Sequence, residues 1–359
     1  MKDLWEPLWT RREGRHRLTS VEVTVTNRCN MRCRHCAVGE SLAMADPDRL
    51  PLDLLFRRLD EVPGLQTLSL TGGELSESLT TLSEFVLPIL RYAKERGLKT
   101  QINTNLTFDL ERYLAIAPYV DVIHISWNYT GVEDFHRIAW GHGREHVSPA
   151  ASEKLFNRMM ENTRALAAAG YFVSAETMVN HETAPHLGWM NRFLADLGCR
   201  RHEVHPMYQA DWASDLPVLT LDQFRGVIER FLDERDPTLW VLFGTFPFLA
   251  CSPLEEDRAI IARAKAAPNL TIRNCPDGRN RVNVNPFTGD VYVTDFAEVP
   301  PLGRIQTDRL DEVFERWLEH ERFAPYNCYC PEAGCTGPNL LVAQMYYPGV
   351  DFRRRRATG

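Results

Sequence analysis

The region from about residue 21 to residue 207 alternates short β-rich runs with longer segments of helical periodicity. Alternating apolar and polar positions predict six strands, at 21–26, 66–70, 98–103, 120–126, 171–179 and 201–207. Helical spacing of apolar residues predicts the intervening helices, at 50–62, 79–97 and 152–170. Such repetition predicts right-handed crossovers and a parallel sheet, and six units are too few for a closed eight-fold barrel. We therefore expect an α/β fold, a partial (β/α)6 barrel that collects its ligands at the C-terminal ends of the strands.

The pattern changes after about residue 208. Helical periodicity at 219–235 is followed by an apolar run at 240–250 and a further helix near 254–266. Two alternating arms flank a turn within 281–296, which predicts a β-hairpin, and a short helix follows at 309–321. The domain prediction is an N-terminal extension (1–20), the partial barrel (21–210), a helical connecting region (211–270), a small C-terminal Fe–S domain with the hairpin (271–345) and an arginine-rich tail (346–359).

Composition places the chain among ordinary globular proteins. Its 359 residues are 44% hydrophobic and 25% charged, which excludes disorder and collagen-like structure. The formal net charge of -7 argues against general nucleic-acid binding, because proteins that bind phosphates usually carry the opposite bias. No apolar run is long enough to cross a membrane, and the first residues lack the apolar stretch of a signal peptide. We expect a cytoplasmic protein that does not contact membranes.

The cysteines direct the search for chemistry. An odd count of nine, in a chain with no export signal, argues against a disulfide scaffold and favours metal binding or redox chemistry. Cys29, Cys33 and Cys36 lie within eight residues, directly after the first predicted strand. Zinc would need a fourth ligand, and the adjacent His35 is poorly placed to supply it. The spacing suits a [4Fe–4S] cluster better, with three irons held by thiolates and one left open.

The segment CNMRCRHC (29–36) resembles the C-x3-C-x2-C signature of the radical S-adenosylmethionine (SAM) superfamily, including an aromatic residue, His35, before the third cysteine. About forty residues later, SLTGGE (69–74) ends the second predicted strand. A GGE tripeptide alone is more typical of a turn, but at this distance after the cysteines the resemblance implies a binding site for the methionyl amino group of SAM. Glycines permit close approach of backbone, and a carboxylate accepts hydrogen bonds from an ammonium group. The residues concerned are Gly72, Gly73 and Glu74.

Other strand ends fit the same family. QINTNL (101–106) resembles its Thr-Asn-Gly strand end, with Leu106 in place of glycine, and HISWN (124–128) resembles a segment whose serine contacts the SAM ribose. By analogy the SAM environment includes Asn103, Asn105 and Ser126. For each of them a hydrogen-bonded strand-end residue is an equal alternative.

Four residues are candidates for catalysis: Glu176, Glu203, His205 and Tyr208. Glu176 lies on the fifth predicted strand, and strand alternation places Glu203 and His205 on one face of the sixth. A buried Glu/His set near a radical site could bind a polar substrate or shuttle protons. The alternative is a polar network that joins the two domains.

A second cysteine group, Cys275, Cys328, Cys330 and Cys335, surrounds the hairpin and ends the C-terminal domain. Four thiolates could close a zinc site, but the arrangement resembles the SPASM and twitch regions of radical SAM proteins, which implies an auxiliary Fe–S cluster. A full SPASM domain has seven cysteines, and here Thr294-Asp295 stands where one is expected, so at most one auxiliary cluster fits. Cys251 or Asp295 could substitute as a ligand, although Cys199 and Cys251 are more typical of buried structural thiols.

The C-x-C-x4-C ending makes nearly the whole chain similar to the CxCxxxxC-motif, YfkAB-like radical SAM family. That resemblance implies reductive cleavage of SAM to a 5′-deoxyadenosyl radical, which abstracts a hydrogen atom from a substrate. It also implies a flavodoxin- or ferredoxin-type electron donor. A peptide substrate is slightly favoured over a small metabolite. The alternative function is a non-catalytic zinc or Fe–S interaction scaffold, which would have no need of GGE at a strand end.

Overall fold

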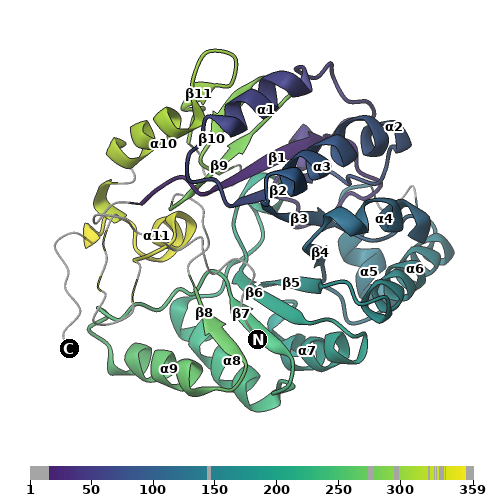
Figure 1. Cartoon of the computed structure of the whole chain (residues 1–359). Helices are drawn as coiled ribbons and strands as arrows, with labels where there is room; N and C mark the ends of the chain where they lie inside the picture. The colour runs from purple at the N-terminus through teal and green to yellow at the C-terminus, as the bar shows by residue number, and fades with distance from the viewer. Residues whose placement is uncertain are drawn as a thin grey trace.

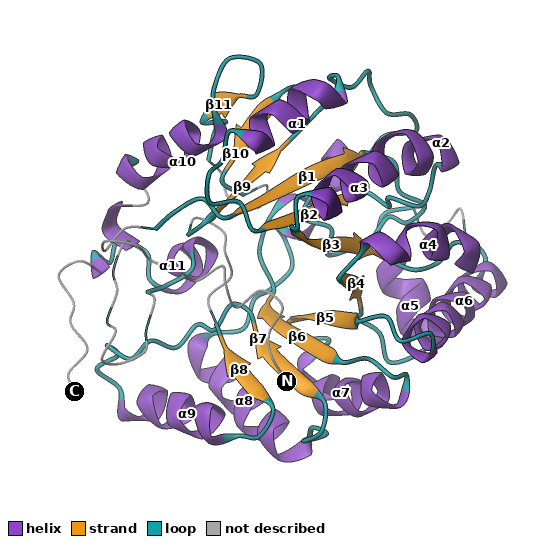
Figure 2. Ribbon diagram, in the orientation of Figure 1, coloured by secondary structure: helices purple, strands orange, loops and turns teal. Residues whose placement is uncertain are grey.

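The structure is a computed structural model that describes residues 16–143, 147–273, 279–294, 299–321, 324–326, 328, 330, 335 and 337–352. Its framework is one eleven-stranded sheet in the order β11-β10-β9-β1-β2-β3-β4-β5-β6-β7-β8. Consecutive strands from β1 to β8 are parallel neighbours, and β9 pairs in parallel with the other side of β1. The sheet curves round so that most helices lie on its outer face (Figures 1 and 2). The α/β class and the open parallel barrel are therefore confirmed.

The strands carry apolar side chains outward and polar ones inward. On β1, Val21, Val23 and Val25 are fully buried in the main hydrophobic core, while Glu22 and Thr24 alternate with them. The strand bounds are β1 Ser20–Thr26, β2 Thr67–Gly72, β3 Lys99–Thr104, β4 Val122–Ser126, β5 Val173–Val179, β6 Arg201–Pro206, β7 Trp240–Phe243, β8 Leu270–Ile272, β9 Arg281–Val284, β10 Asp290–Tyr292 and β11 Gly303–Arg304.

The helices follow the predicted periodicity. Gly97 and Gly170 end helical segments with positive φ angles of 68° and 89°, a conformation that glycine adopts readily. A π-helical turn, Leu82–Val86, joins α2 to α3 within the segment expected as one helix. The bounds are α1 Leu52–Asp60, α2 Leu79–Thr81, α3 Leu87–Glu95, α4 Leu110–Ile116, α5 Val132–Ala139, α6 Pro149–Ala168, α7 Leu187–Asp196, α8 Leu221–Glu234, α9 Glu255–Ala266, α10 Leu310–Glu319 and α11 Leu340–Tyr346.

The sheet extends further than the sequence predicts. The apolar run at 240–250 begins with β7, and β8 follows α9, so the connecting region contributes two parallel strands in addition to its helices. All four residues of β7 are buried, and a short run that is apolar on both faces carries no alternation from which a strand could be recognised.

The predicted hairpin forms as β9 and β10 and is bonded directly to β1. The strand that leads into the first cysteine group therefore lies beside the C-terminal region. Among the described residues, no helix is both long and apolar enough to span a lipid bilayer.

Candidate functional site

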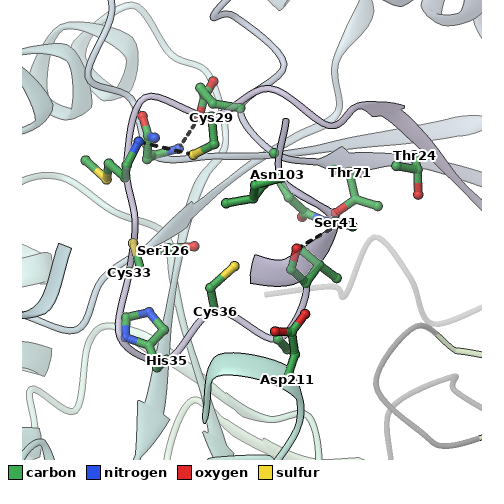
Figure 3. A pocket seen from close by; sticks show the side chains of 18 of the residues that line it. Thr24, Cys29, Cys33, His35, Cys36, Ser41, Thr71, Asn103, Ser126 and Asp211 are labelled. Carbon is green, nitrogen blue, oxygen red and sulfur yellow. Dashed lines mark hydrogen bonds between the residues drawn. The ribbon is translucent and has the colours of Figure 1, made fainter. Parts of the chain in front are cut away.

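A cavity of about 470 Å³ opens at the C-terminal ends of the parallel strands. Its wall brings together eleven of the residues selected from the sequence: Cys29, Cys33, His35, Cys36, Gly72, Gly73, Glu74, Asn103, Asn105, Ser126 and Glu176. The hairpin region completes the wall with Asn285, Tyr292, Thr294 and Val299. Figure 3 shows the loop with Cys29, Cys33, His35 and Cys36 curving around one side of this cavity. Barrel and C-terminal region thus enclose a single site.

The cysteine loop is fixed by backbone hydrogen bonds to its neighbours. The Arg32 and Arg34 amides donate to the carbonyl oxygens of Ala139 and Ile138 at the end of α5, at 3.0 and 2.8 Å. The side chain of Met31 is 2% exposed and anchors the loop in the core. Because these contacts involve no thiol, the three cysteines remain available at the cavity wall.

Burial keeps the loop thiols protonated when no metal is bound. It raises the pKa of Cys29 to about 12, against a lowering by a hydrogen bond from the Met31 amide. Burial and the neighbouring thiols also raise the pKa of Cys33 well above its usual value, although a hydrogen bond with Tyr129 lowers it. Metal binding would therefore release protons from these groups. Three thiols on one loop and an accessible cavity fit a cluster with three protein ligands.

His35 is neutral at physiological pH. Burial lowers its pKa to about 4, and its Nε2 lies 3.2 Å from the Asn128 side-chain amide. The side-chain Oδ1 of Asn128 in turn accepts from the Met178 backbone amide at 2.8 Å, which links the cysteine loop to β5.

The glycines of the GGE segment allow β2 to pack against the cysteine loop. A Cβ on Gly72, at φ +131°, would lie 2.3 Å from the Thr26 carbonyl oxygen, and one on Gly73 would lie 2.1 Å from the Arg28 carbonyl oxygen. These glycines, which the family pattern relates to a ligand, therefore also permit close contact between two segments of the chain.

Glu74 is 1% exposed, and its carboxylate is surrounded by donors of the chain. Oε1 accepts from the Ser76 amide at 3.2 Å and from the Ser76 hydroxyl, and Oε2 accepts from the Asn105 amide at 2.6 Å. The Thr104 hydroxyl donates to both oxygens at 2.8 and 2.9 Å. Four donors match the roughly four lone-pair sites of a carboxylate. Glu74 thus ties the end of β2 to the end of β3, and burial raises its pKa despite these hydrogen bonds.

The next strand ends are also held by the chain. Asn105 Nδ2 donates to Asn30 Oδ1 in the cysteine loop at 3.0 Å, and Gln101 Nε2 donates to Asn103 Oδ1 at 3.0 Å. Leu106, which stands where the family pattern has glycine, is fully buried with a left-handed φ of 54°. Ser126 lies on the cavity wall and is exposed (Figure 3).

The catalytic candidates form a buried network of which only Glu176 lines the cavity. Glu176 lies 3.1 Å from His124 Nε2 and 3.5 Å from His205 Nε2, and His205 Nε2 lies 3.3 Å from Glu203. The Tyr208 hydroxyl donates to the Thr245 hydroxyl at 2.7 Å, within reach of His205. His202 lies on the other face of β6, where its ring nitrogens contact Asn191 and Thr177. The structure therefore places Glu203, His205 and Tyr208 behind the cavity wall, in contact with it through Glu176.

Charges in this network keep both glutamates ionised. Burial alone would raise the pKa of Glu176, but the hydrogen bond from His124 and the charge of His205 outweigh it and hold the pKa below its usual value. Burial opposes ionisation of Glu203 too, and the Arg201 guanidinium, 3.1 Å away, overcomes it with His205. Glu176 thus presents a negative charge to the cavity at neutral pH.

Three of the four predicted C-terminal cysteines line a second, smaller cavity, and Cys251 lines it with them. The cavity is lined by Cys251, Cys328, Cys330 and Cys335, together with Leu249, Ala250, Gly337, Pro338 and Phe352. Cys275 and Asp295 lie outside the described residues. Among the residues that are described, no three His, Cys, Asp or Glu side chains are grouped so as to hold one metal ion.

Tyr129 and Glu22 are among the residues of the main site that were not selected from the sequence. Tyr129, hydrogen-bonded to Cys33, is 2% exposed and follows the fourth strand, where an aromatic residue gives no signal of its own. Glu22 lines the cavity from β1, with Arg281 Nη1 and Asn283 Nδ2 each at 3.5 Å. A charged residue at an inward-facing position of an alternating strand is the signal that could have found it.

Comparison with known proteins agrees with this geometry. Residues 23–187 match the model of the radical SAM superfamily, and residues 207–357 match the YfkB-like domain. The chain is 50% identical over 345 residues to the YfkA protein of Bacillus subtilis, covering 96% of this chain and 92% of that one. The chain belongs to the radical SAM superfamily. The expected family, the SAM-binding [4Fe–4S] cluster with SAM, and the assignment as a radical SAM enzyme are thereby confirmed.

Solved structures share the fold at low sequence identity. SuiB of Streptococcus suis, bound to its precursor peptide SuiA, superimposes with a TM-score of 0.61 at 13% identity, covering 91% of this chain and 71% of SuiB. The structure of anSMEcpe with bound AdoMet and a peptide gives a TM-score of 0.59 at 14% identity, covering 91% and 94%. Because 91% of this chain is covered, the similarity extends beyond the barrel into the C-terminal region.

Proposed function

We propose that this radical SAM enzyme cleaves SAM reductively, abstracts a hydrogen atom from a peptide substrate, and carries one auxiliary Fe–S cluster in its C-terminal region. The observation that carries the proposal is the shared cavity, where three thiols of one loop face the C-terminal ends of β2 to β5. A zinc or Fe–S scaffold needs the thiols but has no need of a cavity lined by GGE and polar strand ends.

The N-terminal cluster would be held by Cys29, Cys33 and Cys36. When bound, it supplies the electron, and SAM supplies the radical that removes the hydrogen atom. SAM would contact the wall formed by Gly72, Gly73, Glu74, Asn103, Asn105 and Ser126, with His35 stabilising the loop. Since the chain already saturates the Glu74 carboxylate, its main contribution is to hold the ends of β2 and β3 in place for SAM.

The substrate would occupy the part of the cavity between Glu176 and the hairpin. Glu22, Glu176 and Asp211 line the cavity, and no lysine or arginine does so among the described residues. Glu176 can receive or return a proton through His205, with Glu203 and Tyr208 positioning that histidine. A peptide is favoured over a small metabolite because two proteins of the same fold, SuiB and anSMEcpe, bind peptides.

The auxiliary cluster would be bound by the C-terminal cysteines and could accept an electron from the substrate radical or bind the substrate. A flavodoxin- or ferredoxin-type protein would reduce the N-terminal cluster. The free thiols that bind the clusters and the protein electron donor both fit a reducing cytoplasm, where thiols persist.

The proposal is tested by anaerobic reconstitution of the full chain. We expect about eight irons per chain, for two [4Fe–4S] clusters, and 5′-deoxyadenosine production with dithionite and SAM. Simultaneous replacement of Cys29, Cys33 and Cys36 by Ala should abolish 5′-deoxyadenosine and leave about four irons. Tightly bound zinc in place of iron, or SAM cleavage by the triple variant, would refute it.

A further inference from the structure

The second cavity, formed by the loop after β7 and the C-terminal segment, places Cys251 together with Cys328, Cys330 and Cys335. The loop is anchored on both sides of the cysteine. The Tyr347 hydroxyl donates to the Pro247 carbonyl oxygen at 2.7 Å, which ties the loop to the end of α11. The Ser252 amide donates to the Leu249 carbonyl oxygen at 2.9 Å, which closes a turn around Cys251.

Hydrogen bonds also hold the described cysteines on the facing side of the cavity. Cys330 and Cys335 form an antiparallel bridge, each amide donating to the other's carbonyl oxygen at 2.9 and 3.0 Å. Gly337 has a φ of +83°, and a Cβ there would lie 2.9 Å from the Cys328 sulfur and 2.7 Å from its carbonyl oxygen. The glycine therefore leaves room for the Cys328 thiol in the cavity.

A positive charge lies beside these thiols. The side chain of Arg279 is 1% exposed, its Nη2 donates to the Pro338 carbonyl oxygen, and Nη2 would lie within contact of a Cβ on Gly337. A buried guanidinium offsets part of the negative charge that thiolates bring into a buried site.

We propose that Cys251 is a ligand of the auxiliary cluster, together with Cys328, Cys330 and Cys335. Each thiol gives up its proton to solvent when its sulfur bonds to iron. Cys251 would replace the cysteine missing after the hairpin, because Thr294 at that position lines the main cavity instead. This assignment rests on the auxiliary cluster of the proposed function and deepens it.

The test uses the full chain in which Cys29, Cys33 and Cys36 are replaced by Ala, so that any remaining iron reports on the C-terminal site. This background should retain about four irons per chain. Adding Cys251→Ala should reduce the iron content at least fourfold and abolish the cluster absorbance and EPR signal. The matched control is Cys199→Ala, a thiol that is 6% exposed and packs in the main core away from both cavities; it should retain the iron.

Two further measurements keep the test decisive if Cys251→Ala fails to fold. Cys251→Ser should retain a cluster with altered EPR g-values, because an oxygen ligand replaces sulfur. In the triple-alanine variant with Cys251 unchanged, iodoacetamide should alkylate Cys251 only after a chelator has removed the iron, as measured by mass spectrometry.

An unchanged iron content and EPR signal in Cys251→Ala, or equal alkylation of Cys251 with and without iron, would overturn the assignment. Loss of iron from Cys275→Ala but not from Cys251→Ala would also overturn it, in favour of Cys275. If the triple-alanine variant binds no iron at all, the auxiliary cluster itself is overturned. SAM cleavage by the wild-type chain would in that case still support the N-terminal cluster and SAM cleavage of the proposed function.

Discussion

Glu74→Ala tests how the GGE segment acts. The substitution removes the acceptor of two backbone amides, those of Ser76 and Asn105, in a site that is 1% exposed. Each buried donor left without a partner costs about 1–3 kcal/mol, so the free energy of unfolding should fall by about 2–6 kcal/mol. The hydroxyl of Ser76 can instead donate to Tyr113, whose oxygen lies 3.0 Å away, and therefore adds little.

With an unfolding entropy of about 2.1 cal/mol/K per residue, a loss of about 4 kcal/mol lowers the melting temperature of the 359-residue chain by about 5 °C. The measurement is thermal unfolding by circular dichroism, beside SAM affinity by calorimetry under anaerobic conditions. Glu84→Ala, at an exposed position of the π-helical turn, is the control and should change neither quantity. Unchanged melting of Glu74→Ala would refute the network. Unchanged melting with lost SAM affinity would instead make the carboxylate a direct SAM ligand.

Three further predictions address other parts of the molecule. Gly73→Ala should lower the iron content of the N-terminal cluster, since the added Cβ would displace the cysteine loop. Gly131→Ala, whose added Cβ has no atom within 4 Å, should keep the iron, and equal iron content in both variants would contradict this packing. Leu106→Gly relieves about 1–2 kcal/mol of left-handed backbone strain but loses a buried side chain worth about 2–5 kcal/mol. Denaturant titration should therefore show a less stable variant, and a more stable one would disprove this comparison of the two energies. Burial lowers the pKa of His202 to about 3, below 6.5 in the unfolded chain, so the free energy of unfolding should fall by about 1.4 kcal/mol per pH unit as the pH falls below 6.5. His202→Gln should flatten this dependence between pH 6.5 and 5, and an equal slope in both proteins would exclude His202 as its source.

Much of the fold was predictable because the spacing of apolar residues in most strands and helices follows a single strand or helix period. The strands from β1 to β6 alternate an outward apolar face with an inward polar one, and their predicted positions agree with the structure to within a few residues. β7 was missed because four consecutive buried residues have no polar face. The pairing of β9 with β1 was also beyond prediction, since nothing local to either strand specifies a partner so distant along the chain.

The site was predictable where its residues are close in sequence. The spacing of Cys29, Cys33 and Cys36 defines a loop whatever the surrounding fold, and GGE ends a strand that parallel pairing must bring near it. The saturation of Glu74 could not be predicted, because its donors come from two strand ends that meet only in the folded chain. For Cys251 the sequence favours a structural thiol and leaves a cluster ligand as the alternative, because the cavity that Cys251 lines is formed by two distant segments.

The pairing of β9 with β1 has a consequence for synthesis on the ribosome. Val21 of β1 is paired with Val282 of β9, which is translated about 260 residues later. At roughly 5–20 residues per second, one edge of β1 stays exposed for about 13 to 52 seconds after the strand emerges. An uncovered edge of this kind is a template for pairing with other chains. Nascent chains that stall before the hairpin should therefore be strong clients of chaperones, and truncation after β8 should give an aggregating product rather than a smaller stable barrel.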